Sequence, residues 1–379
     1  MRLLVLGTSN SRMRLGWTLG LQEALPGARI ENLAIGGSPG VQFAAQMGKD
    51  FSQYDAVFVD SLPNDEVYAG TPGYSSEGFV NAVMAQIYAT IAAQTRLVVV
   101  NFTNKQFLHR KSRRNRQADS LARSCGAHLL DIAHVIRSFE AEFTALHTDL
   151  YESIPHPHRD LARSIGFCLG KAIAANGLGR LREATSHAGH FSLIGPDEYA
   201  APDRLQLFSN SVMSEKFAML DERDVLEFDG SRGICLGFYA NYAGTSCSVN
   251  MASFPDEEGN ARTVSIVINR DLTPAKTLKI FVPVPDGIRL RTLSVTQAPL
   301  HAEFRPRITR RIGVPPHSVL AMSSLVFWSG EAGPAEANRA EDADAATRLT
   351  FDVCREAATL LREKGFPLDP DSLAMLPFL

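Results

Sequence analysis

Small and polar residues follow the first apolar run of this chain, and their types suit nucleophilic chemistry. Gly7-Thr8-Ser9-Asn10 comes directly after Leu3–Leu6, so the Ser9 hydroxyl lies where a strand would end. A serine oxygen becomes an effective nucleophile when a histidine accepts its proton and hydrogen-bond donors stabilise the oxyanion that forms. The first half of the chain contains candidates for both kinds of partner.

The histidine candidates lie in Ser153-Ile154-Pro155-His156-Pro157-His158, just before a segment with helical spacing. His156, which a proline follows, is the candidate base. His158 is an alternative two residues later. If it is not the base, we expect His158 to be a surface residue or a substrate contact.

The candidate oxyanion donors each follow a predicted strand. The backbone N–H of Ser9 has no partner inside a helix that begins there. A glycine at Gly37 lets a backbone N–H approach a substrate oxygen closely, and the side-chain amide of Asn64 supplies a third donor. Ser38 and Arg12 are further candidate substrate contacts. Groups that follow several parallel strands meet at one edge of the sheet, so these residues are expected to form one site.

The elements that would position these residues alternate between strand-like and helix-like segments. The apolar stripe from Phe79 to Ile91, for example, has helical spacing. Strands separated by helices form parallel sheets that helices cover on both faces. We therefore predict a flavodoxin-like three-layer α/β domain with a five-stranded parallel sheet over residues 1–182. Its predicted strands are Leu3–Leu6, Arg29–Ile35, Ala56–Asp60, Leu97–Phe102 and His128–Ile132.

The second half of the chain has a different texture. Short strand-like runs are separated by glycine, serine and proline, which predicts a β-rich domain, a sandwich, over residues 190–328. Residues 329–379 are expected to form a flexible linker followed by a C-terminal helix over 346–364. The predicted strands of the β-rich domain are Ile234–Tyr239, Thr263–Asn269, Leu278–Val284, Ile288–Val295 and Ser318–Leu325.

Four short blocks of the first half resemble those of the SGNH hydrolases, also called GDSL-type lipases and esterases. Gly7-Thr8-Ser9-Asn10 is similar to the Gly-Asp-Ser-Leu turn, with Thr in place of Asp. Asn32-Leu33-Ala34-Ile35-Gly36-Gly37 is similar to the second block, and Leu62-Pro63-Asn64-Asp65 to the third, whose leading Gly is replaced. Ser153-Ile154-Pro155-His156-Pro157 is similar to the Asp-x-x-His-Pro block. The resemblance extends over about the first half of the chain, residues 1–180.

The resemblance implies a role for each matching residue: Ser9 as nucleophile, His156 as general base, and the N–H groups of Ser9 and Gly37 with the Asn64 amide as oxyanion donors. Ser153 stands where the family has its triad acid. Three arrangements remain open. Glu152 or Asp149 orients the imidazole, a backbone carbonyl does so and leaves a Ser–His dyad, or the site is catalytically inactive.

Composition restricts the partners. The 38 Lys and Arg nearly balance the 41 Asp and Glu, so the net charge of −3 gives no reason to expect nucleic-acid binding. No apolar run is long enough for a membrane span. The five cysteines are scattered without metal-type spacing and indicate reduced thiols, so we expect a cytoplasmic protein with no metal and no cofactor.

The most basic stretch, His109–Arg116, precedes a predicted helix. Charge runs are usually solvated, but cations at a helix N-terminus oppose the helix dipole. Arg110–Arg116 is therefore a candidate site for an anionic ligand such as a phosphate, an acyl-CoA or an acidic glycan. Nucleic acid is less favoured, because no aromatic residues alternate with the cations.

These observations lead to three expectations of function. The first is a serine esterase or O-acyltransferase that acts on ester groups, such as acetyl groups, of a carbohydrate or polysaccharide precursor through Ser9 and His156. The second is an inactive SGNH-like module that binds a glycan, with the β-rich domain contributing, or that scaffolds polysaccharide synthesis. The third is a phosphate-binding α/β domain with Gly7–Ser11 at a helix N-terminus; it lacks the usual glycine and lysine motifs and ranks last.

Overall fold

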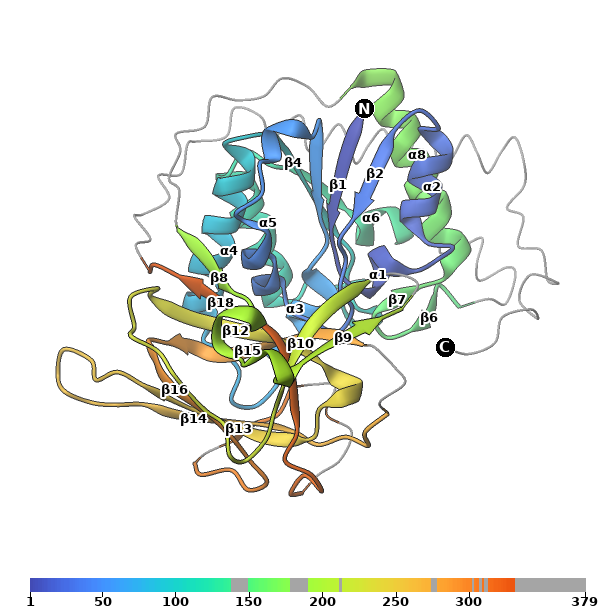
Figure 1. Cartoon of the computed structure of the whole chain (residues 1–379). Coiled ribbons are helices and arrows are strands. Elements are labelled where there is room, and N and C mark those ends of the chain that lie inside the picture. Colours follow the sequence, from blue (N-terminus) through green and yellow to red (C-terminus); the bar gives the residue numbers. More distant parts are fainter. Residues whose placement is uncertain are drawn as a thin grey trace.

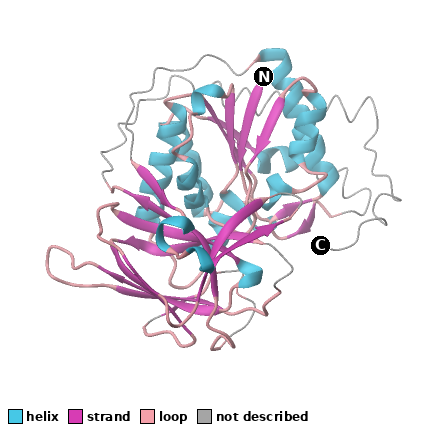
Figure 2. Ribbon diagram, in the orientation of Figure 1, coloured by secondary structure: helices cyan, strands magenta, loops and turns pink. Residues whose placement is uncertain are grey.

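The computed structural model describes residues 1–137, 149–177, 190–210, 213–273, 278–301, 303–306, 309 and 313–330. An α/β domain is followed by a β-rich domain, which lies against the carboxyl ends of the parallel strands (Figures 1 and 2). The predicted C-terminal helix and nearly all of the predicted linker lie outside the described residues. Within the described part of the chain, no helix combines the length and the apolar character that crossing a membrane requires.

The α/β domain is built on a five-stranded sheet in the order β2-β1-β3-β4-β5, in which every strand pair is parallel. This confirms the predicted fold class. The order reverses beside β1, so the carboxyl end of β1 is where such a fold leaves a crevice for a ligand. The strands are β1 (Arg2–Leu6), β2 (Arg29–Asn32), β3 (Ala56–Val59), β4 (Arg96–Asn101) and β5 (His128–Asp131).

Helices cover both faces of this sheet because alternate residues of each strand point to opposite sides. Leu3 and Val5 of β1 join a buried cluster with α2, α6 and α8, whereas Leu4 and Leu6 join a second cluster with α4, α5 and η1. The bounds are α2 (Trp17–Ala24), η1 (Gly40–Gln46), α4 (Glu77–Ala92), α5 (Arg113–Ser124), α6 (Ile132–Arg137) and α8 (Arg159–Asn176).

Shorter elements line the sheet edge at the carboxyl ends of the strands. The one-turn helix α1 follows β1, α3 follows β3, and a two-stranded antiparallel hairpin, β6 and β7, precedes α8. The bounds are α1 (Ser9–Arg12), α3 (Leu62–Ala69), η3 (Lys105–Phe107), β6 (Tyr151–Ser153) and β7 (His156–Pro157). Another short element, η2 (Phe51–Gln53), precedes β3 and lies at the amino ends of the strands.

The β-rich domain consists of two sheets. One has the order β15-β12-β18-β10-β9, with β8 also paired to β18, and the other has the order β11-β16-β13-β14-β17. Side chains from both sheets share one buried cluster, as in a sandwich. The strands are β8 (Phe191–Ile194), β9 (Leu205–Ser209), β10 (Ser214–Leu220), β11 (Val225–Glu227), β12 (Ile234–Asn241), β13 (Cys247–Ser253), β14 (Thr263–Ile268), β15 (Lys279–Ile288), β16 (Leu290–Thr296), β17 (Glu303–Phe304) and β18 (Leu320–Trp328), and the short helices are α9 (Pro196–Tyr199), η4 (Pro202–Arg204) and η5 (Tyr242–Gly244).

The sequence reading missed β13, although this strand is central to its sheet. Its residues Cys-Ser-Val-Asn-Met-Ala-Ser alternate apolar and small polar side chains and form no continuous apolar run. The polar positions are buried but paired: Ser265 of β14 donates to the Asn250 side-chain oxygen at 2.6 Å. A strand can therefore be central without looking apolar when its polar side chains bond to a neighbouring strand.

The two domains share a hydrophobic cluster. Tyr239, Phe281 and Val326 of the β-rich domain lie in the same buried group as Val41 and Phe43 of η1. Continuous packing of this kind fixes the β-rich domain against the edge of the α/β domain where the candidate residues lie.

Candidate active site

Ser9 is the first residue of α1, directly beyond the carboxyl end of β1. The turn that presents it is fixed by Asp60 at the end of β3, whose Oδ2 accepts hydrogen bonds from Thr8 Oγ1 at 2.9 Å and Ser11 Oγ at 2.8 Å. Asp60 has no exposed surface, and burial raises its pKa to about 6 although these hydrogen bonds oppose the shift. Thr8, which replaces the aspartate of the resembling motif, thus ties the Ser9 turn to β3.

His156 meets Ser9 from the β6–β7 hairpin. Its Nε2 lies 2.7 Å from Ser9 Oγ. Asn10 Nδ2 donates to the Pro155 carbonyl at 3.0 Å, and the Lys105 N–H donates to the Ile154 carbonyl at 2.8 Å. The hairpin is therefore held by hydrogen bonds to α1 and to η3, and these bonds keep the imidazole next to the serine hydroxyl.

The group that contacts Nδ1, the ring nitrogen of His156 that does not face Ser9, is a hydroxyl. His156 Nδ1 lies 2.8 Å from Ser153 Oγ, its neighbour across the hairpin. For Nε2 to accept the proton of Ser9, Nδ1 must carry the ring proton and donate it to Ser153 Oγ. Burial lowers the pKa of His156, and the nearby charge of Glu152 opposes this shift in part.

This arrangement corrects the expectation for the triad acid. Glu152 faces Arg159, whose Nε lies 2.6 Å from Oε1, and Asp149 lies 3.5 Å from Lys105 Nζ with its side chain largely exposed. Neither carboxylate forms a hydrogen bond with the ring of His156, since each has a nearby cation of its own. Ser153 instead fills the position, an arrangement outside the three that the sequence left open.

The candidate oxyanion donors lie in α1, in the loop after β2 and in α3. The Ser9 N–H lies in the first turn of α1 and has no intrahelical acceptor. A Cβ placed on Gly36 would lie 3.4 Å from Ser9 Cβ, so the loop after β2 passes directly beside the serine. Gly37 has φ of +71°, a left-handed conformation that favours glycine. Asn64 Nδ2, in the first turn of α3, donates to the Ser38 carbonyl at 2.8 Å and keeps a second amide proton.

Two predicted substrate contacts have other partners. Ser38 is fully buried, and its Oγ accepts a hydrogen bond from the Phe281 N–H of the β-rich domain at 2.9 Å. His158 is neither a surface residue nor part of the Ser9 contact: it is buried and caps α8, where Nδ1 accepts from the Asp160 N–H at 3.4 Å. Arg12 lies at the end of α1 with its side chain exposed, so its expected contact with substrate stays a prediction.

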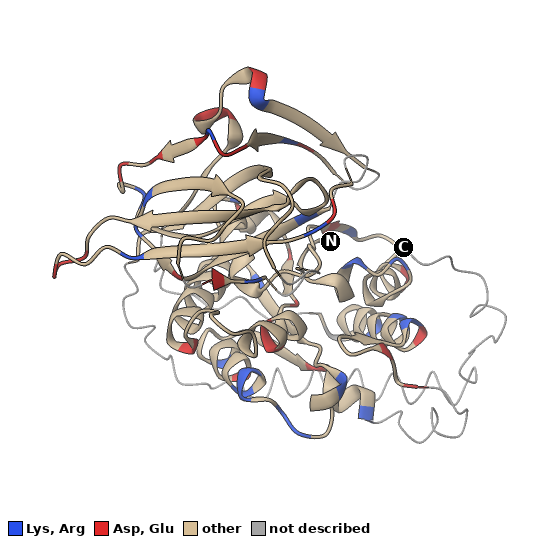
Figure 3. Cartoon of the chain, turned by 90° about the horizontal axis from the view of Figure 1, so that it is seen from below, with Lys and Arg blue, Asp and Glu red and all other residues tan. Residues whose placement is uncertain are grey.

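The basic run Arg110–Arg116 faces carboxylates of this chain. Lys111 pairs with Asp119 and, at 2.8 Å, with Asp131. Arg113 pairs with Glu77 at 2.7 Å, and the buried Arg114 lies 3.8 Å from Asp65. Acidic and basic residues are distributed over both domains (Figure 3). Internal ion pairs therefore account for Lys111, Arg113 and Arg114, and an anionic ligand at this run stays a prediction.

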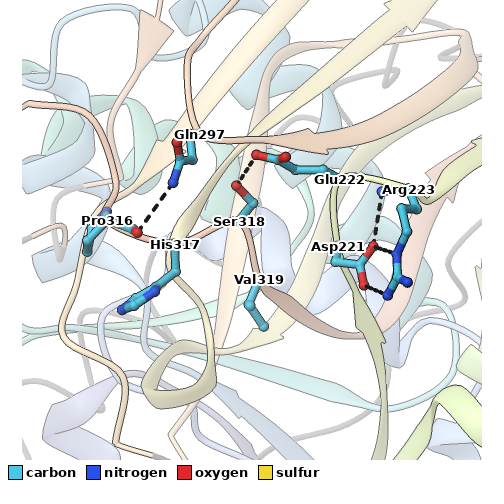
Figure 4. A pocket seen from close by; sticks show the side chains of 8 residues that line it. All are labelled: Asp221, Glu222, Arg223, Gln297, Pro316, His317, Ser318 and Val319. Carbon is cyan, nitrogen blue, oxygen red and sulfur yellow. Dashed lines mark hydrogen bonds and ion pairs between the residues drawn. The ribbon is translucent and has the colours of Figure 1, made fainter.

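An open hollow of about 470 Å³ lies in the β-rich domain (Figure 4). Its polar groups bond largely to one another: Arg223 to Asp221, Ser318 to Glu222, and Gln297 to the Pro316 carbonyl. None of the candidate site residues lines it. Among the described residues, no cluster of three or more His, Cys, Asp or Glu side chains is arranged to hold a metal ion.

The site contains residues that the sequence reading did not assign. Asp60, Asn10 and the Phe281 backbone all hold the turn or loops around Ser9. Asp60 follows the apolar run of β3 as Asn64 does, which is a signal that sequence reasoning had available. No local pattern marks Phe281, because its contact is made by a backbone N–H from a distant strand.

The fold and the site together define an α/β domain with a Ser–His contact at the carboxyl edge of its parallel sheet, joined to a β-rich domain. No protein-family model matches the chain, and no curated protein sequence matches it either. Among solved structures, a two-domain esterase (CEX) active on acetylated mannans, co-crystallised with mannopentaose, is similar with a TM-score of 0.50 and 11% identity. The match covers 88% of this chain and 92% of that one, so it extends over both domains of this chain.

Smaller proteins match less than half of this chain. A member of the lipolytic protein G-D-S-L family from Veillonella parvula DSM 2008 has a TM-score of 0.34 and 11% identity over 43% of this chain and 92% of its own. LAE5, an α/β hydrolase from the metagenome of Lake Arreo, has a TM-score of 0.37 and 15% identity over 47% of this chain and 96% of its own. At such identities the likeness concerns the fold.

Proposed function

We propose that this protein is a serine esterase of the SGNH type that acts on acetyl esters of a carbohydrate, with Ser9 as nucleophile and His156 as general base. The observation that carries this proposal is the 2.7 Å contact between Ser9 Oγ and His156 Nε2 at the carboxyl edge of the parallel sheet. The carbohydrate substrate is supported by the similar two-domain esterase, which acts on acetylated mannans.

The proposed acylation step uses Ser9, His156 and the three candidate oxyanion donors. Ser9 Oγ attacks the acyl carbonyl carbon while His156 Nε2 takes the hydroxyl proton. The carbonyl oxygen becomes an oxyanion, which the N–H groups of Ser9 and Gly37 and the Asn64 amide stabilise. When the tetrahedral intermediate collapses, the ester C–O bond breaks and the sugar oxygen leaves with the proton that Nε2 had taken.

Deacylation repeats these steps with a new nucleophile. A water molecule attacks the acyl-Ser9 carbonyl, His156 Nε2 takes its proton, and the proton returns to Ser9 Oγ as the acid leaves. If a sugar hydroxyl attacks in place of water, the same site is an O-acyltransferase. Both outcomes use the same residues, so the acceptor decides between hydrolase and transferase.

The experiment that tests Ser9 is covalent labelling with a fluorophosphonate. We expect the wild-type protein to be labelled, and Ser9→Ala and His156→Ala to lose labelling. Ser52→Ala, which removes an exposed serine on η2, is the control and keeps wild-type labelling. Labelling that persists in Ser9→Ala, or a folded wild type that does not react, contradicts the proposal.

The substrate is tested by acetate release. We expect the wild type to hydrolyse 4-nitrophenyl acetate and to release acetate from acetylated mannan or xylan, and Ser9→Ala to do neither. Turnover of the chromogenic ester without release from any acetylated glycan would reject the carbohydrate part of the proposal and keep the esterase part.

A second candidate function is glycan binding without turnover. The specific observation in its favour is the neutral Ser153 in place of a carboxylate behind His156. In serine proteases, replacing the triad aspartate by its amide lowers kcat about 10⁴-fold. With a hydroxyl as the partner of His156, we therefore expect a slower enzyme and not an inactive one. For this reason we rank binding without turnover second.

A further inference from the structure

We propose that the β-rich domain is a working part of the active site, because it positions the oxyanion loop. This name refers to Gly36–Ser38, the loop that passes beside Ser9. The inference rests on the proposed function and assigns positioning roles to Ser38 and Tyr239, which touch no substrate themselves.

The first contact uses the open edge of a strand. Among the described residues, the sheet neighbour of β15 is β12, on one side. An edge strand leaves backbone N–H groups without partners on its free side. The Phe281 N–H donates to Ser38 Oγ at 2.9 Å, and both residues are fully buried. Ser38 of the oxyanion loop therefore accepts the hydrogen bond that a carbonyl of a neighbouring strand would accept in a wider sheet.

The second contact holds the segment directly after the loop. The Tyr239 hydroxyl of β12 donates to the Gln42 carbonyl of η1 at 2.9 Å, and both residues are buried. The Tyr239 ring packs edge-on against Phe281, with 5.2 Å between the ring centroids. The two donors from the β-rich domain are thus fixed to each other, and together they hold both ends of a short stretch, Ser38 to Gln42.

The α/β domain holds the oxyanion loop and Gly40 from the opposite side. The Tyr68 hydroxyl of α3 donates to the Gly37 carbonyl at 3.2 Å, and Asn64 Nδ2 donates to the Ser38 carbonyl at 2.8 Å. Asp65 Oδ1 accepts from the Gly40 N–H at 2.7 Å. The oxyanion loop therefore lies between α3 and β15, with hydrogen bonds to each.

These contacts matter for catalysis because an oxyanion hole depends on fixed donor positions. Without Phe281 and Tyr239 as donors, every group of the hole is still present, but the stretch from Gly37 to Gln42 loses two of the five hydrogen bonds described above. An oxyanion forms only along the reaction path, so misplaced donors lower kcat and leave KM nearly unchanged.

Tyr239→Phe and Ser38→Ala test the proposal in the full chain. We expect kcat for 4-nitrophenyl acetate to fall about tenfold in each, with KM within about twofold of wild type, since the donors are displaced and not removed. Tyr199→Phe is the matched control. It also loses a tyrosine hydroxyl that donates to a backbone carbonyl at 2.9 Å, that of Met322, but inside the β-rich domain. Its kcat should stay within about twofold of wild type.

A double-mutant cycle separates positioning from general destabilisation. If Ser38 acts through the Asn64 amide, Ser38→Ala costs less kcat in an Asn64→Ala background than in the wild type. Additive effects, or equal kcat in Tyr239→Phe and Tyr199→Phe, would overturn the inference. Should Ser38→Ala fail to fold, Tyr239→Phe decides the matter with its control.

The inference and the proposed function fail differently. A wild type without Ser9-dependent labelling or turnover overturns both. A wild type with Ser9-dependent turnover, whose kcat is unaffected in Tyr239→Phe and Ser38→Ala, overturns only the role of the β-rich domain.

Discussion

Ser153 differs chemically from the carboxylate whose position it occupies. A hydroxyl can accept the Nδ1 proton of His156 and so keep the ring in the required tautomer. It carries no charge, and therefore does not stabilise the imidazolium that forms when His156 takes the Ser9 proton. The orientation of the base is thus preserved in this site, whereas the electrostatic part of the triad is missing.

A carboxylate at this position should restore that electrostatic part. We expect Ser153→Asp to raise kcat at least about tenfold, a fraction of the ~10⁴-fold effect that loss of the acid has elsewhere. Ser153 is exposed, so the longer side chain and its charge need no burial. Steady-state kinetics with 4-nitrophenyl acetate measures the gain, and Ser153→Asn, similar in size and neutral, is the control. Equal kcat values for Ser153→Asp and Ser153→Asn would show that a negative charge next to His156 Nδ1 does not contribute to catalysis in this protein.

The burial of His156 should determine the pH at which activity is lost on the acid side. The imidazole must be neutral to take the Ser9 proton, and burial lowers its pKa. Activity is therefore lost as pH falls through a value below 6.5, the ordinary pKa of histidine. The profile of kcat/KM against pH gives this midpoint. Because the charge of Glu152 raises the pKa of His156, Glu152→Gln should move the midpoint still lower. A wild-type midpoint above 6.5 would contradict the assignment of the base.

At the scale of elements, the helix that follows the β6–β7 hairpin is set by backbone contact with α2. A Cβ on Gly166 of α8 would lie 1.8 Å from the Trp17 carbonyl oxygen, and one on Gly20 of α2 would lie 1.9 Å from the Arg163 carbonyl oxygen. The two helices therefore touch through their glycines. Since α8 begins three residues after His156, this close packing also fixes where the hairpin leaves the domain.

This packing leads to opposite expectations for two helical glycines. Gly166→Ala has no room for its methyl group and should lower the free energy of unfolding by about 1–3 kcal/mol. Gly78→Ala, in the first turn of α4, meets no atom within 4 Å and should raise it by up to about 1 kcal/mol. Urea unfolding measures both changes. A Gly166→Ala protein as stable as Gly78→Ala would show that the helices separate easily.

At the scale of the whole molecule, the two domains behave as one packed body in the region of the site. Phe79 of α4 packs edge-on against Trp328 of β18, with 6.2 Å between the ring centroids, and the buried cluster around η1 includes residues of both domains. The Ser76 N–H donates to Asp286, and the Asp286 N–H donates to Ser75 Oγ at 2.8 Å. Apolar packing and hydrogen bonds between the domains thus hold the β-rich domain against the edge of the α/β domain where Ser9 lies.

The sequence by itself determined the parallel sheet and the set of residues at its edge. Periodicity identifies buried strands and amphipathic helices, and the carboxyl ends of parallel strands must meet, so Ser9, Gly37, Asn64 and His156 could be grouped from their places after strands or before a helix. Expectations failed where a residue had no local signature. His158 became a helix cap, and the central strand β13 escaped notice because its polar side chains are paired within the sheet.

Only the tertiary structure decided which partners these residues have. Ser153 faces His156 because a tight hairpin brings them opposite each other, while Glu152 turns to Arg159. Ser38 bonds to Phe281, 243 positions away in the chain, through a backbone N–H that every residue except proline carries. At the Phe281 end, such a contact depends on where the two domains touch and not on side-chain type, and for that reason no local pattern in the amino-acid sequence predicts it.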